Sequence, residues 1–127
     1  MRRMIFALSV TALAVASLPG LALAHAKLLS STPAANAAVS RVTAISLTFN
    51  ERLIASTVKV ELLMTGMPGM TNHAPMKVAF RSTMARDGKS MTLSPTRRLS
   101  PGTYMVKWSA AGADTHRMGS EFSFTVS

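Results

Sequence analysis

The feature of this sequence that most restricts its fold is a series of short segments in which apolar and polar residues alternate. Such an alternation predicts a β-strand with one buried face, because successive side chains of a strand point to opposite sides. No segment carries the apolar spacing of an amphipathic helix. The predicted strands are 27–30, 43–49, 58–63, 77–81, 90–93, 103–108 and 121–126.

Turn-forming residues separate these segments, notably Pro33, Asp87-Gly88, Pro95 and Pro101-Gly102. About seven short strands in one domain predict an all-β fold, either an immunoglobulin-like Greek-key sandwich or a small β-barrel. The alternation also predicts the core, which comprises Ile45, Leu47, Phe49, Val58, Val60, Leu62, Val78, Phe80, Met91, Leu93, Tyr104, Val106, Trp108, Phe122, Phe124 and Val126.

The first 24 residues have the three parts of a secretory signal peptide. Arg2 and Arg3 precede an apolar run over 4–15, and small residues in 21–24 predict cleavage after Ala24. A transmembrane anchor is the alternative, but polar residues, Pro and Gly interrupt a run that is already shorter than the roughly 20 apolar residues of a span. We therefore expect a signal peptide over 1–24, a periplasmic location and one mature domain over 25–127.

The absence of cysteine restricts the metal chemistry open to this chain. It excludes disulfides, thiolate zinc sites, iron–sulfur clusters and blue-copper centres. Cleavage would lower the formal net charge from +9 to +7, but the basic residues are scattered and one Trp and one Tyr offer no platform for stacking bases. We expect no nucleic-acid partner, and the ten Met and three His become the informative residues.

A first candidate metal site combines His25 with the Asp114-Thr115-His116 segment. Cleavage after Ala24 would give His25 a free α-amine, which together with the imidazole can chelate a metal. In an extended segment, Asp114 and His116 would project to the same side. Amine, two imidazoles and a carboxylate suit Cu(II) better than Ni(II) or Zn(II). Glu51 is either an exposed carboxylate or a group that orients a ligand by a hydrogen bond.

A second candidate site is the methionine-rich segment 64–76. Its Gly and Pro residues exclude a regular helix, and an extended polyproline-like path would align every third side chain along one edge. Thioethers are soft donors that prefer Cu(I). The segment therefore predicts a site for monovalent copper, with a flexible apolar loop as the alternative. Its candidate ligands are Met64, Met67, Met70, His73 and Met76.

Six motifs are distributed over residues 25–127. They are His25-Ala-Lys-Leu with Ser31-Thr-Pro33, Phe49-Asn-Glu51, the 64–76 segment, Gly102-Thr-Tyr-Met-Val-Lys-Trp108, Asp114-Thr-His116 and a closing Gly-Ser-x-Phe-x-Phe. With these motifs the mature domain resembles the CopC family of periplasmic copper-binding proteins. The resemblance implies a cupredoxin-like Greek-key β-barrel with a Cu(II) site at one end and a Cu(I) site at the other. It also implies an inner-membrane partner of the CopD type for copper import or resistance.

For His25, Asp114 and His116 the resemblance implies the role of Cu(II) ligands, with Glu51 as a supporting residue. We expect a monomeric copper carrier without enzymatic activity. One alternative is an oxidative enzyme that attacks polysaccharides through a copper brace of His25 and His116, although the Asp114 carboxylate would fill a position that oxygen needs. The other is a metal-free sandwich module for adhesion or assembly, which leaves the methionine-rich segment and His25 unexplained.

Overall fold

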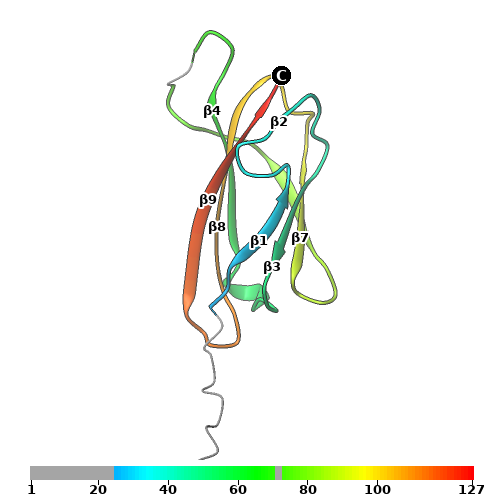
Figure 1. The fold of residues 1–127 in the computed structure, drawn as a ribbon, viewed down its shortest axis with the longest axis vertical. Coiled ribbons are helices and arrows are strands. Elements are labelled where there is room, and N and C mark those ends of the chain that lie inside the picture. Colours follow the sequence, from blue (N-terminus) through cyan, green and yellow to red (C-terminus); the bar gives the residue numbers. More distant parts are fainter. Residues whose placement is uncertain (1–24, 71–72) are drawn as a thin grey trace, which may run out of the picture.

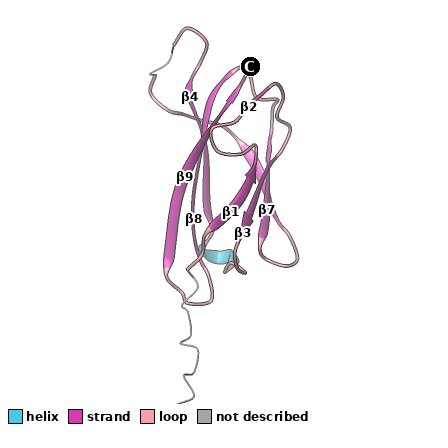
Figure 2. Ribbon diagram, viewed as in Figure 1, coloured by secondary structure: helices cyan, strands magenta, loops and turns pink. Residues whose placement is uncertain are grey.

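The computed structural model describes residues 25–70 and 73–127, which form two packed β-sheets (Figures 1 and 2). One sheet has the strand order β1-β3-β7-β6 and the other β2-β9-β8-β4-β5, and only the β2–β9 pair is parallel. The predicted signal peptide lies outside the described residues. The strands are β1 (Leu28–Thr32), β2 (Ala38–Val39), β3 (Ile45–Phe49), β4 (Lys59–Gly66), β5 (Met76–Lys77), β6 (Phe80–Met84), β7 (Ser90–Pro95), β8 (Gly102–Ala111) and β9 (Arg117–Val126), and a short 3₁₀ helix, η1, spans Ala55–Thr57.

The all-β prediction is confirmed, and the fold is a sandwich of two sheets. Nine strands form among the described residues instead of about seven, because the chain adds the two-residue strands β2 and β5. The single strand predicted at 77–81 is wrong: Lys77 pairs with Leu63 in one sheet, whereas Phe80 pairs with Pro95 in the other. The chain therefore crosses between the sheets at this point. Within the described part of the chain, no helix is long and apolar enough to span a bilayer.

The inner faces of the two sheets form the predicted core. The inward positions of β3, β7, β8 and β9 are buried as expected, and Leu62 of β4 is buried with them. The rings of Phe49 and Trp108 meet edge to face with centroids 5.0 Å apart, and Tyr104 stacks on Phe124 at 5.7 Å. Val58, Val60, Val78 and Phe80 are only partly buried and pack around the rim of this core. Each fully buried large apolar side chain contributes about 1.5–3 kcal/mol to folding.

Two long strands determine how far apart the two ends of the sandwich lie. β8 and β9 are ten residues each and pair from Gly102↔Val126 to Ala111↔Arg117. At about 3.3 Å per residue, their ends are separated by roughly 30 Å. The β8–β9 connection lies at one end, and the methionine-rich segment extends beyond β4 at the other (Figure 1). One ion therefore cannot contact both candidate sites at once.

Candidate metal centre

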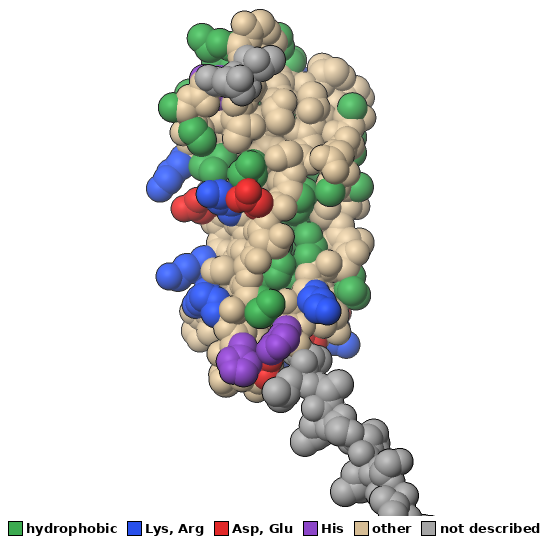
Figure 3. All heavy atoms as spheres, turned by 60° about the vertical axis from the view of Figure 1, so that its left-hand side comes forward, with side chains coloured by type: hydrophobic (Ala, Val, Ile, Leu, Met, Phe, Trp, Pro, Cys, Tyr) green, Lys and Arg blue, Asp and Glu red, His purple; other side chains and the backbone are tan. Residues whose placement is uncertain are grey.

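Three predicted ligands from distant parts of the chain meet at one end of the sandwich. Nδ1 of His25 lies 2.7 Å from Oδ2 of Asp114, and Nδ1 of His116 lies 3.5 Å from the same oxygen. The nearest donor atoms of the three side chains are all within 4.8 Å of one another. Figure 3 shows the imidazoles side by side at this end of the surface. The arrangement can offer two ring nitrogens and one carboxylate oxygen to a single metal ion.

A turn, rather than an extended strand, brings Asp114 and His116 together. Ala113 and Asp114 lie in a turn, the Thr115 N–H donates to the Gly112 carbonyl at 2.9 Å, and Thr115 has a φ of 62°. The expectation of an extended Asp114-Thr115-His116 segment is therefore wrong in its geometry. Convergence comes from the β8–β9 connection bending back on itself, so that the backbone N–H of His116 also donates to Oδ1 of Asp114 at 3.2 Å.

The Asp114 carboxylate is the central anion of this cluster. Its side chain is only 5% exposed, whereas both imidazoles are much more open to solvent. Burial alone would raise the pKa of the Asp114 carboxyl, but the His116 backbone N–H and then the His25 ring hold that pKa below its ordinary value. Asp114 is therefore ionised at neutral pH and attracts a cation to the space between the rings.

The side chain of Asn50, a residue that the sequence did not identify as functional, holds the backbone around His25. Its amide donates to the His25 carbonyl at 2.9 Å, and its carbonyl accepts the Lys27 N–H at 2.8 Å. These two bonds join the segment before β1 to the end of β3 and determine where His25 lies. The position of Asn50 directly after a predicted buried strand was one indication of a role. Its hydrogen-bond partners, however, are backbone groups, and no residue pattern reveals them.

Glu51 lies against Gly112, in the connection between β8 and β9 that also carries Asp114 and His116. Its Oε1 is buried and has no hydrogen bond among the described residues. The backbone of Gly112 lies in close contact with this oxygen: a Cβ atom added to Gly112 would fall 1.5 Å from it. A buried, unpaired carboxylate oxygen is costly, so this position favours a hydrogen-bond donor or a cation that arrives with the ligand. The interpretation of Glu51 as an ordinary exposed carboxylate is therefore wrong.

The methionine-rich segment forms a tight turn, and the expected polyproline-like path is wrong. Met67 and Met70 exchange both backbone hydrogen bonds at 2.9 Å, with Pro68 and Gly69 between them and Gly69 at a φ of 80°. Pro followed by a residue with positive φ is typical of a type II turn. Directly paired residues project their side chains to the same face of a hairpin, so the thioethers of Met67 and Met70 share one face.

The remaining members of the segment have different environments. Met64 belongs to β4, is 7% exposed, and packs its methyl group against Gly102, so a strand buries this member of the segment. Met76 of β5 is exposed. Nδ1 of His73 donates to the Ala74 carbonyl at 2.7 Å, which leaves its buried Nε2 as an unpaired acceptor among the described residues. The candidate ligands for a soft ion are thus three exposed thioethers and one imidazole whose buried Nε2 has no hydrogen bond among the described residues.

Comparison with known proteins gives consistent matches over this domain. A family model described as the CopC domain matches residues 28–127. Copper resistance protein C of Xanthomonas campestris pv. juglandis is 45% identical over 105 residues, which cover 83% of this chain and 82% of that protein. Copper resistance protein C of Escherichia coli is 43% identical over 105 residues, which cover 83% of each.

Solved structures match the same fold. PcoC, a copper resistance protein from Escherichia coli, superimposes with a TM-score of 0.74 at 42% identity, over 80% of this chain and 99% of that one. CopC from Methylosinus trichosporium OB3b superimposes with a TM-score of 0.64 over 80% of this chain and 93% of that one. At 22% identity, the second match supports the fold alone.

Proposed function

The chain belongs to the CopC family of copper resistance proteins, and on that premise we propose that it is a monomeric periplasmic copper carrier with two sites. Cu(II) binds at the His25 end and Cu(I) at the methionine-rich end. The observation that carries the proposal is the meeting of two imidazoles on one Asp114 oxygen, at 2.7 and 3.5 Å, from segments 89 residues apart.

At the Cu(II) end, cleavage after Ala24 completes the ligand set. The new α-amine and Nδ1 of His25 chelate one ion, and His116 and Asp114 supply the remaining nitrogen and oxygen. Such an N,N,N,O set suits the tetragonal preference of Cu(II). Glu51 accepts a hydrogen bond from the α-amine, which satisfies its buried oxygen and orients the amine toward the metal.

At the Cu(I) end, the ligands are Met67, Met70, Met76 and His73. The shared hairpin face of Met67 and Met70 and the free Nε2 of His73 support this set. Neutral sulfur ligands stabilise the monovalent ion and exclude harder cations. Met64, which packs in the core, contributes to the base of the segment instead of binding the ion.

Transport, rather than oxidative catalysis, fits the position of Asp114. Its carboxylate oxygen lies between the two imidazoles and occupies a position that an oxygen-activating copper brace would leave open. Residues 1–24 direct export and are then removed. A CopD-type protein of the inner membrane receives the ion or delivers it.

The direct test of copper binding is the metal content of the purified mature protein. Elemental analysis after gel filtration is expected to give one copper per chain from Cu(II), and a second when Cu(I) is supplied under reducing, oxygen-free conditions. EPR of the Cu(II) form should show nitrogen hyperfine coupling. A protein that retains no copper after gel filtration would exclude the carrier function and favour a metal-free module.

Replacing Asn50 with Ala is expected to weaken Cu(II) binding by about 10- to 100-fold, the usual effect of losing a group that orients a ligand. The reason is that the His25 carbonyl and the Lys27 N–H both lose their partner. Competition titration against a Cu(II) chelator measures the effect. Asn50→Asp is the matched control, because it keeps the acceptor for Lys27 and replaces the donor to His25 with a charged carboxylate oxygen. Unchanged Cu(II) affinity in Asn50→Ala would show that Asn50 does not position His25.

A further inference from the structure

Three arginines surround one hollow at the methionine-rich end. Arg41, Arg97 and Arg98 line a cavity of about 170 Å³, together with Thr43, Pro95 and Thr96. The lining contains no carboxylate side chain. Guanidinium groups bind phosphate oxygens through paired hydrogen bonds. The Thr43 hydroxyl can add a further donor, whereas the Thr96 hydroxyl donates to the Ala79 carbonyl at 3.4 Å. The hollow therefore has the composition of a site for a phosphate group.

Among the described residues, these arginines have no acidic side chain as a counter-charge. All three are exposed, and none forms an ion pair within the described part of the chain, where the only Lys or Arg pair with an acid is Lys107 with Glu121. The carboxylate side chains lie elsewhere: Glu61 and Glu121 within β4 and β9, and Glu51, Asp87 and Asp114 at or near the opposite end.

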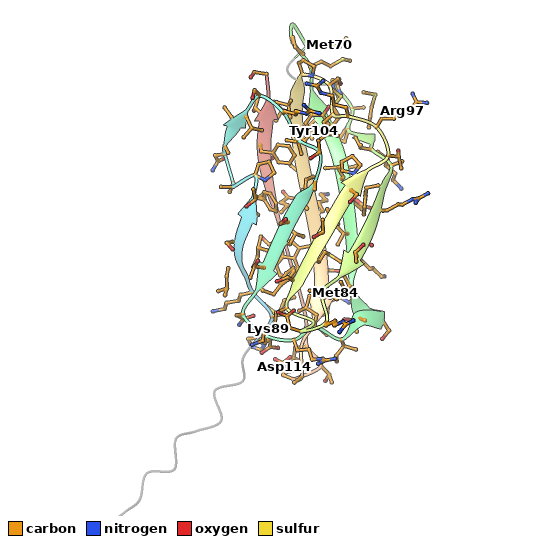
Figure 4. The ribbon with its side chains drawn as sticks, turned by 90° about the vertical axis from the view of Figure 1, so that its right-hand side faces the viewer. Met70, Met84, Lys89, Arg97, Tyr104 and Asp114 are labelled. Atoms are coloured by element: carbon orange, nitrogen blue, oxygen red, sulfur yellow. The ribbon has the colours of Figure 1, made fainter. Side chains whose placement is uncertain are left out.

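An apolar tip lies at the same end of the molecule. Gly66 pairs with Thr103, and Gly102 pairs with Val126. The turn beyond Gly66 and the loop before Gly102 therefore extend from the same end of the sheet. Figure 4 shows Met70 and Arg97 at this end, far from Asp114. Met67 and Met70 are both exposed, the latter at 54%, with Pro68 and Gly69 at the corner of the turn.

We propose that this end docks on an anionic phospholipid surface. The Met67–Met70 turn enters the boundary between headgroups and acyl chains, and the hollow between Arg41, Arg97 and Arg98 takes a headgroup phosphate. An apolar turn and cations without acidic partners at one end of the molecule fit a bilayer better than an acidic protein. Apolar side chains gain by burial at the interface, and cations gain from the negative surface potential. Docking needs no copper and is therefore tested on the metal-free protein, but it uses Met67 and Met70, which are also proposed Cu(I) ligands.

The test measures binding of the metal-free mature protein to vesicles by flotation. We expect it to bind vesicles of phosphatidylcholine mixed with phosphatidylglycerol, and not vesicles of phosphatidylcholine alone. The triple variant Arg41→Gln, Arg97→Gln, Arg98→Gln should bind roughly tenfold or more weakly, because each cation near an anionic surface contributes about a fivefold factor before salt screening. Met67→Ser with Met70→Ser should also weaken binding without changing the charge.

The matched control removes three cations nearer the other end, in Lys27→Gln, Arg86→Gln, Lys89→Gln. Its net charge equals that of the arginine variant, and its binding should stay close to that of the parent protein. Equal loss in both triple variants would overturn the proposal, because net charge alone would then explain binding. Absence of binding to the anionic vesicles would also overturn it, in favour of an acidic protein partner. Chemical shift changes with inorganic phosphate but no vesicle binding would identify a free-anion site and refute membrane docking.

Discussion

A protein that starts at Leu21 instead of His25 is expected to lose tight Cu(II) binding and to keep its Cu(I) affinity. The extension leaves the His25 imidazole in place but moves the α-amine four residues away, so the chelate ring cannot form. Losing a ligand should lower Cu(II) affinity more than losing a residue that only orients a ligand. We therefore expect Cu(II) affinity to fall by more than about a hundredfold. The roughly 30 Å between the sites protects the Cu(I) end from the change.

The measurement is competition titration with chelators of known affinity, together with EPR of the Cu(II) forms. The matched control adds the same four residues, Leu-Ala-Leu-Ala, after Ser127, which keeps composition and leaves the amine of His25 free. The extended form should show fewer coupled nitrogens, and the control should match the parent protein. Equal Cu(II) affinity in all three proteins would rule out the α-amine as a ligand.

The sequence predicted the centre of the fold better than its edges. Ile45, Leu47 and Phe49 were assigned to the core because strands that pack on one side must alternate, and burial leaves little freedom there. The strand expected at 77–81 failed because an edge strand is held by few contacts and can change sheets where the pattern still alternates. Val78, which was predicted to lie in the core, accordingly lies at its rim.

The residues that meet in the candidate site were predictable from the sequence, but their geometry was not. Asp114 and His116 were identified by their chemical type and spacing, yet the turn with Thr115 at positive φ arises from how the β8–β9 hairpin closes. Asn50 and Gly112 act through backbone contacts and close approach to Glu51. Both depend on the tertiary positions of two distant loops, which local patterns do not encode.

The methionine-rich end gives the second large effect. Replacing Met67, Met70 and Met76 together with Leu is expected to lower Cu(I) affinity by more than about a hundredfold, since only His73 would remain of the proposed ligands. Leucine matches methionine in volume, and the three side chains are exposed, so the free energy of unfolding should change by less than about 1.5 kcal/mol. Cu(II) affinity should not change, because its ligands lie at the other end of β8.

Met64→Leu is the control that separates ligands from packing. Met64 shares the segment and the side-chain chemistry of the other three, but it lies in the core against Gly102. It should therefore keep full Cu(I) affinity in competition titration with a Cu(I) chelator. If Met64→Leu lost as much Cu(I) affinity as the triple variant, the segment would have to open to expose Met64, and the ligand set proposed from the turn would be wrong. If the triple variant kept its affinity, the exposed thioethers would not be ligands at all.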